Sequence, residues 1–371
     1  MPTPEPDDPP AIPESAASDT ERRFPCEECG AILRFSPGVG RLKCDYCGHE
    51  NAIPQSAADI RENDFLRALE QLTDEADTEA QTIVKCEACG AEVEKPGHVT
   101  SLECAFCGIT ITTTGVTKRL IKPQALLPFR VTREEGLAHF RQWLRKLWFA
   151  PNALKKYYRS ETKLSGIYTP YWTYDCRTTT WYTGMRGTHY YVTVGSGKSR
   201  RVERRTSWAP ASGTVWNRFN DVLILGSESL PRRYADELRP WDLEQLTPYQ
   251  DEYLSGFVSE SYTVDLATGF KVAKQVMAPV IEQTIRADIG GDEQMIQSSH
   301  SEYHAITYKH ILLPVWISAY RYRERVFRYL VNGRTGEVQG ERPYSAWKIA
   351  GAVLAGLIVV GGIVWIVLAN Q

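Results

Sequence analysis

The 371-residue sequence predicts an α+β fold that joins two small four-cysteine modules, an antiparallel-sheet domain and one C-terminal transmembrane helix. Three observations predict this fold. Eight of the nine cysteines form two copies of one spacing. The region from residue 120 to 343 alternates between helical patterns and runs rich in Tyr, Trp, Thr and Val. A run of 21 uncharged residues lies near the end of the chain.

The N-terminal residues 1–20 are rich in Pro, Asp, Glu, Ser and Ala, which predicts a disordered acidic segment. The first ten residues have neither a basic stretch nor an apolar one, so we expect no secretory signal peptide. Eight cysteines occur in the repeated pairs and one, Cys176, is left over. This usage is more typical of a protein in a reducing compartment than of a secreted protein held by disulfides.

The cysteine spacing predicts two zinc ribbons, over residues 21–54 and 84–113. Each copy has two Cys-x2-Cys pairs separated by fourteen residues. One such pair supplies two thiolates to a tetrahedral zinc ion, and two pairs around a short hairpin complete the ribbon. Four thiolates leave no open position, so we expect two structural Zn²⁺ ions rather than catalytic ones. The alternative is disulfides or free thiols, which the repeated spacing disfavours. The predicted ligands are Cys26, Cys29, Cys44, Cys47, Cys86, Cys89, Cys104 and Cys107.

The linker 55–83 between the ribbons is expected to be acidic and partly helical. Residues 55–80 contain two basic and eight acidic residues, a net charge of −6. Apolar residues from Ile60 to Leu72 follow helical spacing, which predicts a short amphipathic helix that leads into a flexible tether.

The region 120–343 predicts one aromatic-rich α+β domain. Thr132 and Glu135 have the spacing of a capping box, which predicts a helix that runs to Trp148 and stops before Pro151. Several antiparallel strands are expected over 164–225, helices near 241–255 and 264–287, and further strands over 303–338.

A Pro-x-Trp pattern occurs twice, at Pro170 and Trp172 and again at Pro314 and Trp316. It suggests a duplicated α+β domain. The alternative is two similar edge strands, because sheet edges tolerate proline.

Residues 347–369 predict a single-pass transmembrane helix. Its 21 uncharged residues span about 31 Å as a helix, close to the ~30 Å of a bilayer core. Arg342 and Lys348 precede it, so we expect the N-terminal domains to lie in the cytoplasm and the helix in the cytoplasmic (inner) membrane. Small residues spaced four apart permit a homodimer through this helix.

The net charge is divided unevenly along the chain. Residues 1–111 contain 9 Lys/Arg and 22 Asp/Glu, a net charge of −13, whereas the remaining residues contain 34 and 23, a net charge of +11. The basic part is therefore expected to contact anionic lipid.

Several motifs resemble catalytic or binding sites, but none predicts a catalytic residue. The sequence 194–199 ends like a phosphate-binding loop but has Val192 where a glycine is required, so a hairpin turn is expected. His300 and His304 frame a glutamate at the wrong position for a metalloprotease helix. The acidic Gly-rich sequence 288–292 predicts a helix end, and Cys176 has no base beside it in sequence.

Four further motifs of the domain, together with its layout, resemble a known family. They are WLRKLWFAP (143–151), YTPYWTYD (168–175), DIGGD (288–292) and NGRTG (332–336). The complete chain resembles a bacterial family of uncharacterised membrane-anchored double zinc-ribbon proteins, and its ribbons are similar to those of general transcription factors. Members are sometimes labelled primosomal replication helicases, but this chain lacks the ATP-binding motif of a helicase. The resemblance implies no established function.

The favoured hypothesis is a tail-anchored membrane adaptor or scaffold whose ribbons recruit a cytoplasmic protein, without catalysis. One alternative is a membrane-tethered nucleic-acid-binding protein. Ribbon 1 has five basic and five acidic residues, and ribbon 2 has two and four, which disfavours phosphate binding by the ribbons. A second alternative is an enzyme whose site is assembled within the α+β domain.

Overall fold

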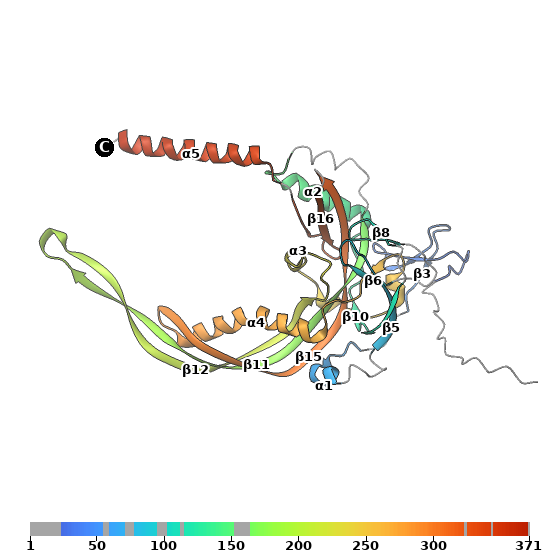
Figure 1. Ribbon diagram of the computed structural model, residues 1–371, viewed down its shortest axis with the longest axis horizontal. Coiled ribbons are helices and arrows are strands. Elements are labelled where there is room, and N and C mark those ends of the chain that lie inside the picture. Colours follow the sequence, from blue (N-terminus) through green and yellow to red (C-terminus); the bar gives the residue numbers. More distant parts are fainter. Residues whose placement is uncertain are drawn as a thin grey trace, which may run out of the picture.

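The computed structural model of the chain describes residues 24–54, 59–70, 78–94, 102–111, 115–151, 164–322, 325–342 and 344–369, so the predicted disordered segment 1–20 lies outside it. As the sequence predicts, the chain is an α+β protein with antiparallel sheets, two four-cysteine clusters and an apolar C-terminal helix. A body that contains both ribbons carries a long projecting hairpin and the separate helix α5 (Figure 1).

Each ribbon has small antiparallel sheets of its own. Ribbon 1 has the strand order β1-β2-β3, and ribbon 2 has the order β6-β5-β9 with a separate β7-β8 pair. Their bounds are β1 (Arg34–Ser36), β2 (Arg41–Lys43), β3 (Glu50–Asn51), β5 (Thr78–Lys85), β6 (Glu92–Glu94), β7 (Leu102–Glu103), β8 (Thr110–Ile111) and β9 (Val116–Ile121).

The linker between the ribbons joins the domain over the part that the structure describes. It forms β4 (Asn63–Asp64), which pairs with β15, followed by the short helix α1 (Phe65–Glu70), which lies within the stretch predicted to be helical. The buried ring of Phe65 contacts Tyr174 and Phe270. The pairing of β4 with β15 replaces the start of the predicted helix, and α1 retains its middle part. Residues 71–77 of the predicted tether lie outside the described residues.

A nine-stranded sheet forms the core of the α+β domain. Its main path is β12-β11-β15-β10-β13, and β4, β14, β16 and β17 pair beside that path. Its remaining strands are β10 (Ala125–Leu126), β11 (Ser165–Val194), β12 (Arg201–Leu225), β13 (Thr247–Pro248), β14 (Val258–Ser259), β15 (Glu293–Tyr322), β16 (Arg325–Asn332) and β17 (Val338–Gly340).

The β11–β12 hairpin extends beyond the body as a long arm, residues 176–219 (Figure 1). Two long strands therefore replace the several shorter ones expected over 164–225, and β15 begins at Glu293 rather than near 303. The turn contains a 3-10 turn at Gly197–Ser199, which confirms the predicted hairpin turn. Residues from α4 (Leu266–Ile289) pack on one face of the arm, so its inner half has a hydrophobic core.

The predicted helices agree with the structure in part. Helix α2 (Arg133–Lys146) has the predicted capping box, but it ends before Trp148. Helix α4 ends at Gly290 with φ of 65°, which confirms the predicted helix end. The helix expected near 241–255 is wrong, because Thr247–Pro248 pairs with β10 and divides the segment into two 3-10 turns. These turns are Leu243–Gln245 and Asp251–Leu254, and the short helix α3 (Arg232–Asp236) precedes them.

The domain contains two similar βαββ units, β10-α2-β11-β12 and β14-α4-β15-β16. Each unit places its short first strand parallel to the long strand of the other. Ala125 of β10 pairs with Ile311 of β15, and Val258 of β14 pairs with Ile167 of β11. This reciprocal pairing gives the two units an approximate twofold relation.

The two tryptophans of the repeated motif strengthen that relation. Trp172 Nε1 donates to the carbonyl oxygen of Val264, and Trp316 Nε1 donates to that of Val131, both at 2.9 Å. Each of these valines directly precedes the N-cap residue of a long helix, α4 or α2. The structure therefore supports the duplication that the Pro-x-Trp repeat suggested.

The alternative that the prolines mark edge strands is wrong, since β11 and β15 are neighbours inside the sheet. β12 ends at Leu225, which pairs with the residue after Pro170. β16 ends at the corresponding place, because its last residue, Asn332, pairs with the residue after Pro314. Each proline carbonyl accepts a hydrogen bond from a glycine N–H at 2.8–2.9 Å. The missing proline N–H groups therefore interrupt no ladder.

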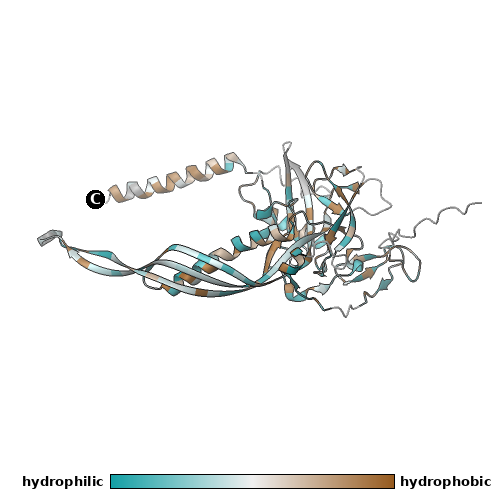
Figure 2. Cartoon of the chain, turned by 60° about the horizontal axis from the view of Figure 1, so that its bottom comes forward, coloured by the Kyte–Doolittle hydropathy of each residue, from teal (hydrophilic) through white to brown (hydrophobic). Residues whose placement is uncertain are grey.

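Helix α5 (Ala346–Ala369) is, among the described residues, the one helix long and apolar enough to cross a membrane. Its window Ala346–Ile363 has a mean hydropathy of 1.9, and none of its residues is buried. Figure 2 shows its hydrophobic colouring along most of its length. Lys348 Nζ donates to the carbonyl oxygens of Trp148 and Ala150, which holds the start of α5 against the turn after α2.

The duplication provides a matched pair of glycine substitutions. A Cβ atom at Gly269 would lie 2.4 Å from the hydroxyl oxygen of the buried Tyr174, whereas one at Gly136 would lie 3.1 Å from the end of the Leu164 side chain. We expect Gly269→Ala to destabilise the protein by roughly 1–3 kcal/mol through overpacking. Gly136→Ala should change stability by less than about 1 kcal/mol, because helix propensity offsets a softer contact. Thermal unfolding would test whether Gly269→Ala lowers the melting temperature more than Gly136→Ala does. Equal melting temperatures of the two variants would contradict the prediction.

Candidate metal centres

The eight predicted ligands form two compact sulfur tetrads. Within each tetrad all Sγ atoms lie within 4.8 Å of one another. The Cys26–Cys47 and Cys29–Cys44 Sγ atoms are 3.6 and 3.5 Å apart, and Cys86–Cys107 and Cys89–Cys104 are both 3.6 Å apart. Four thiolates at about 2.3 Å from a zinc ion would place their sulfurs about 3.8 Å apart. The donor set and its spacing therefore fit a metal ion such as zinc.

Local backbone geometry produces this arrangement. Gly30, Gly48, Gly90 and Gly108 follow the second cysteine of each pair and have φ between 72° and 76°. Each glycine N–H donates to the carbonyl oxygen of the first cysteine of its pair at 2.8–3.0 Å. This left-handed position is accessible to glycine without steric cost, so the chain can turn beneath the four sulfurs.

The crowded thiols influence one another's protonation. Backbone N–H groups, that of Cys47 foremost, lower the pKa of Cys44 to about 6. The hydrogen bond from Cys104 lowers the pKa of Cys89 to about 5. The pKa of Cys104 is raised, since its thiol donates that hydrogen bond and is buried. A bound cation would favour the thiolate form of all four ligands.

Ribbon 1 packs directly on the α+β domain. The Phe35 N–H donates to the carbonyl oxygen of Ser255 at 3.0 Å, and the Ser255 hydroxyl donates to the carbonyl oxygen of Leu33 at 2.7 Å. The Phe35 ring contacts Tyr253 edge-on at 5.2 Å. The first tetrad therefore belongs to a hydrophobic core shared with the domain.

Ribbon 2 meets the same segment of the domain a few residues later. Val93 and Glu260 form an isolated antiparallel bridge, and the Ser261 N–H donates to the carbonyl oxygen of Glu92 at 3.1 Å. The fully buried Phe106 and both buried cysteines of the second tetrad join a core that includes Leu127. Residues 253–261 thus connect both metal centres to the domain.

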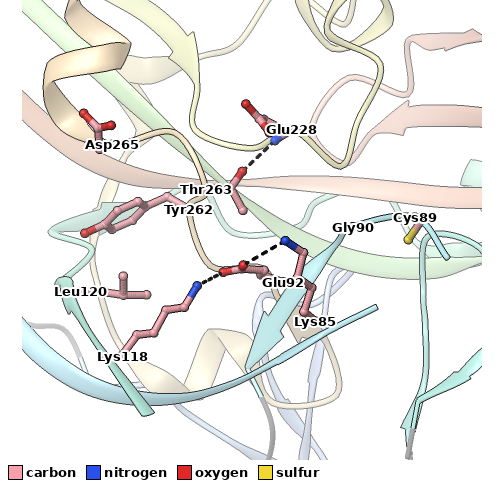
Figure 3. A pocket seen from close by; sticks show the side chains of 10 residues that line it. All are labelled: Lys85, Cys89, Gly90, Glu92, Lys118, Leu120, Glu228, Tyr262, Thr263 and Asp265. Atoms are coloured by element: carbon pink, nitrogen blue, oxygen red, sulfur yellow. Dashed lines mark hydrogen bonds and ion pairs between the residues drawn. The ribbon is translucent and has the colours of Figure 1, made fainter. Parts of the chain in front are cut away.

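A cavity of about 390 Å³ lies at the junction between ribbon 2 and the domain (Figure 3). Lys118 Nζ and Lys85 Nζ lie 2.6 and 4.0 Å from the buried carboxylate of Glu92. On the opposite wall, the Glu228 N–H donates to the Thr263 hydroxyl at 2.9 Å. The lysine contacts lie within ribbon 2 and the Glu228 contact lies within the domain, so the cavity is bounded by ribbon 2 on one side and by the domain on the other.

The other candidate groups from the sequence do not join the tetrads. His300 and His304 lie on β15, and the structure places His300 over the Trp181 ring. Asp288 accepts a hydrogen bond from the Tyr182 hydroxyl at 2.6 Å. The buried Cys176 lies 3.6 Å from the Met277 sulfur, and burial raises its pKa to about 11, which is unfavourable for a nucleophile.

Sequence reasoning missed a charged cluster at the base of the arm. Lys309 Nζ lies 2.9 Å from Glu62 and 2.8 Å from Asp221, whose N–H donates to Asp175 at 2.8 Å. Asp221 has a φ of 51° at an irregularity where β12 bulges, and burial raises the pKa of Asp175 to about 6. These residues are far apart in sequence, so no local pattern could have brought them together.

Comparison with known proteins gives no function. No protein-family model and no solved structure matches the chain. Among curated proteins it is 25% identical over 329 residues to the "Uncharacterized protein YdjG" of Bacillus subtilis (strain 168), an alignment that covers 88% of this chain and 92% of that protein. The resemblance to membrane-anchored double zinc-ribbon proteins therefore remains an expectation.

Zinc stoichiometry would test the tetrads. We expect the purified chain to hold two zinc ions, and Cys29→Ser or Cys89→Ser to reduce this to one, because three thiolates bind zinc more weakly than four. Cys176→Ser is the matched control and should retain both ions, since Cys176 lies outside the tetrads. Elemental analysis gives the count, and a second ion retained by either tetrad variant would contradict the assignment.

A buried carboxyl group beside ribbon 2 predicts a pH effect. Glu260 is 2% exposed, and burial raises its pKa to about 7. A carboxyl pKa that is higher in the folded state makes stability fall as pH rises from the unfolded value through about 7. Glu260→Gln should therefore stabilise the protein by roughly 1 kcal/mol more at about pH 9 than at about pH 6. Thermal unfolding of both proteins would show this, and a pH-independent difference would contradict it.

Proposed function

We propose that the chain is a tail-anchored membrane adaptor whose zinc ribbons recruit a cytoplasmic protein. Helix α5 would hold the chain in the cytoplasmic membrane, with the ribbons and the α+β domain in the cytoplasm. The length and apolar surface of α5 support this anchoring. Arg342 and Lys348 beside its N-terminal end support the orientation.

The outer surface of ribbon 1 is the observation that carries the proposal. Its inner residues Leu33 and Phe35 are buried against the domain. Ile32, Val39 and Tyr46 are instead 52%, 47% and 86% exposed. Tyr46 lies between Cys44 and Cys47, so the second metal-binding turn carries it. Exposed aromatic and aliphatic side chains on a rigid scaffold are typical of protein-binding surfaces.

The fixed position of ribbon 1 on the α+β domain favours a role in protein binding. Hydrogen bonds from Phe35 and Ser255 hold ribbon 1 in one orientation. A client that binds a fixed surface orders fewer groups, and this reduces the entropic cost of association. The metal would then stabilise the turn that carries Tyr46 and would take no part in a reaction.

A capture experiment on crosslinked membranes would test the proposal. Full-length Val39→Ser/Tyr46→Ser should capture its cytoplasmic client at least about tenfold less than the wild type, because truncating interface hot spots commonly costs about 2 kcal/mol. The variant should keep two zinc ions and remain in the membrane fraction. Quantitative mass spectrometry of the captured proteins gives the comparison.

The matched control is Val276→Ser/Val280→Ser, which removes two exposed valines from α4. It should leave capture unchanged, because α4 lies on the arm and away from ribbon 1. An unchanged set of captured proteins for the ribbon variant would contradict the proposal. Equal loss in both variants would also contradict it, because the ribbon would then have no specific role.

A further inference from the structure

The outer end of the arm has no covering element among the described residues. We name residues 186–208 the arm tip; it comprises the end of β11, the turn and the start of β12. Pairing of β15 with β11 ends at Gly187 and Glu293, so the arm is two-stranded beyond that point. Helix α4 also ends near there, at Ile289. The arm tip is therefore a ribbon with two solvent-facing surfaces (Figures 1 and 2).

The arm tip is strongly basic. It contains six basic residues and one acidic residue, Glu203, which gives a net charge of +5. Glu203 lies 2.7 Å from Arg201 and 3.7 Å from Arg205. Asp292 and Glu293 also contact the base of the tip, at His189. Three carboxylates cannot neutralise the six basic residues, which also include Arg186, Lys198, Arg200 and Arg204. Like charges at this density repel one another, so a surface of opposite charge would stabilise them.

Large aromatic groups are exposed among these charges. Tyr191 is 70% exposed and pairs across the hairpin with Arg204, and Tyr190 is 45% exposed and pairs with Arg205. Because successive residues point to opposite faces of a strand, each face of the tip carries one Tyr–Arg pair. Trp208 is 37% exposed and pairs across the hairpin with Gly187, which has no side chain. This combination is typical of surfaces that contact lipid headgroups.

We propose that the arm tip docks on the headgroups of an anionic lipid bilayer. Each arginine or lysine close to such a surface strengthens binding through its attraction to the negative lipid charge. Tyrosine and tryptophan rings would lie at the interface, with their polar atoms toward water. A polar two-stranded ribbon with unpaired edges cannot enter hydrocarbon, so the tip lies along the headgroups.

The apolar helix α5 supports a membrane as the partner. In both views the arm and α5 leave the body toward the same side (Figures 1 and 2). A bilayer crossed by α5 in this orientation would also meet the arm, so docking of the tip on the headgroups of that bilayer requires α5 to turn relative to the arm. This inference rests on the anchoring part of the proposed function and is independent of client recruitment by ribbon 1.

Amide hydrogen exchange of the full-length chain in nanodiscs would test the proposal. One set of discs contains phosphatidylcholine alone, and the other also contains phosphatidylglycerol. We expect exchange in residues 188–206 to be at least about fivefold slower in the anionic discs, and this protection to disappear at about 1 M salt, where the Debye length is ~3 Å. Chains that fail to enter either disc would count against the anchor, which separates the two hypotheses.

Two variants sharpen the test. Arg200→Gln/Arg204→Gln should lose most of the protection, and Tyr191→Ser should lose part of it while the charge is unchanged. The matched control is Arg232→Gln/Arg233→Gln on α3, which removes two exposed arginines outside the arm and should retain full protection.

Two outcomes would overturn the proposal. The first is equal exchange of the arm tip in neutral and anionic discs at low salt. The second is protection in neutral discs that appears only when single-stranded RNA or DNA is added, which would assign the basic surface to nucleic acid instead.

Discussion

The antiparallel pairing of β11 with β15 is the constraint on which the rest of the structure depends. It places the two Pro-x-Trp motifs side by side and lets each strand receive the short first strand of the opposite unit. The indoles of Trp172 and Trp316 then fix the starts of α4 and α2 through one hydrogen bond each. The arm is the continuation of the same pairing beyond the body, so the core and the projection share one structural origin.

The metal centres depend on this core as well as on their own ligands. Small cysteine-rich modules bury little apolar surface, so metal ligation usually supplies much of their stability. Here Phe35 and Phe106 also bring the ribbons into hydrophobic clusters of the domain. Two modules that are separate in sequence therefore act as parts of one body, joined at residues 253–261.

The sequence predicted the features that depend on local spacing. The cysteine tetrads, the capping box of Thr132 and Glu135, the helix end at Gly290 and the apolar α5 all follow from neighbouring residues. It could not predict features set by distant contacts. Phe65 belongs to the core because Tyr174 and Phe270 surround it, and Thr247–Pro248 is extended because β10 pairs with it. The cluster around Lys309 likewise joins residues that only the strand pairing brings together.

The continuous strand β11 sets the distance between the arm and the body of the molecule. Its 30 residues run without a break from Val194 in the arm to Ser165 and include Tyr168, whose carbonyl oxygen accepts the Glu260 N–H at 3.0 Å. Glu260 in turn bridges to Val93 of ribbon 2. At about 3.3 Å per residue, the strand has a contour length of about 100 Å. Continuous hydrogen-bonded backbone therefore connects the arm to the segment that contacts ribbon 2, at a spacing that the covalent chain itself sets.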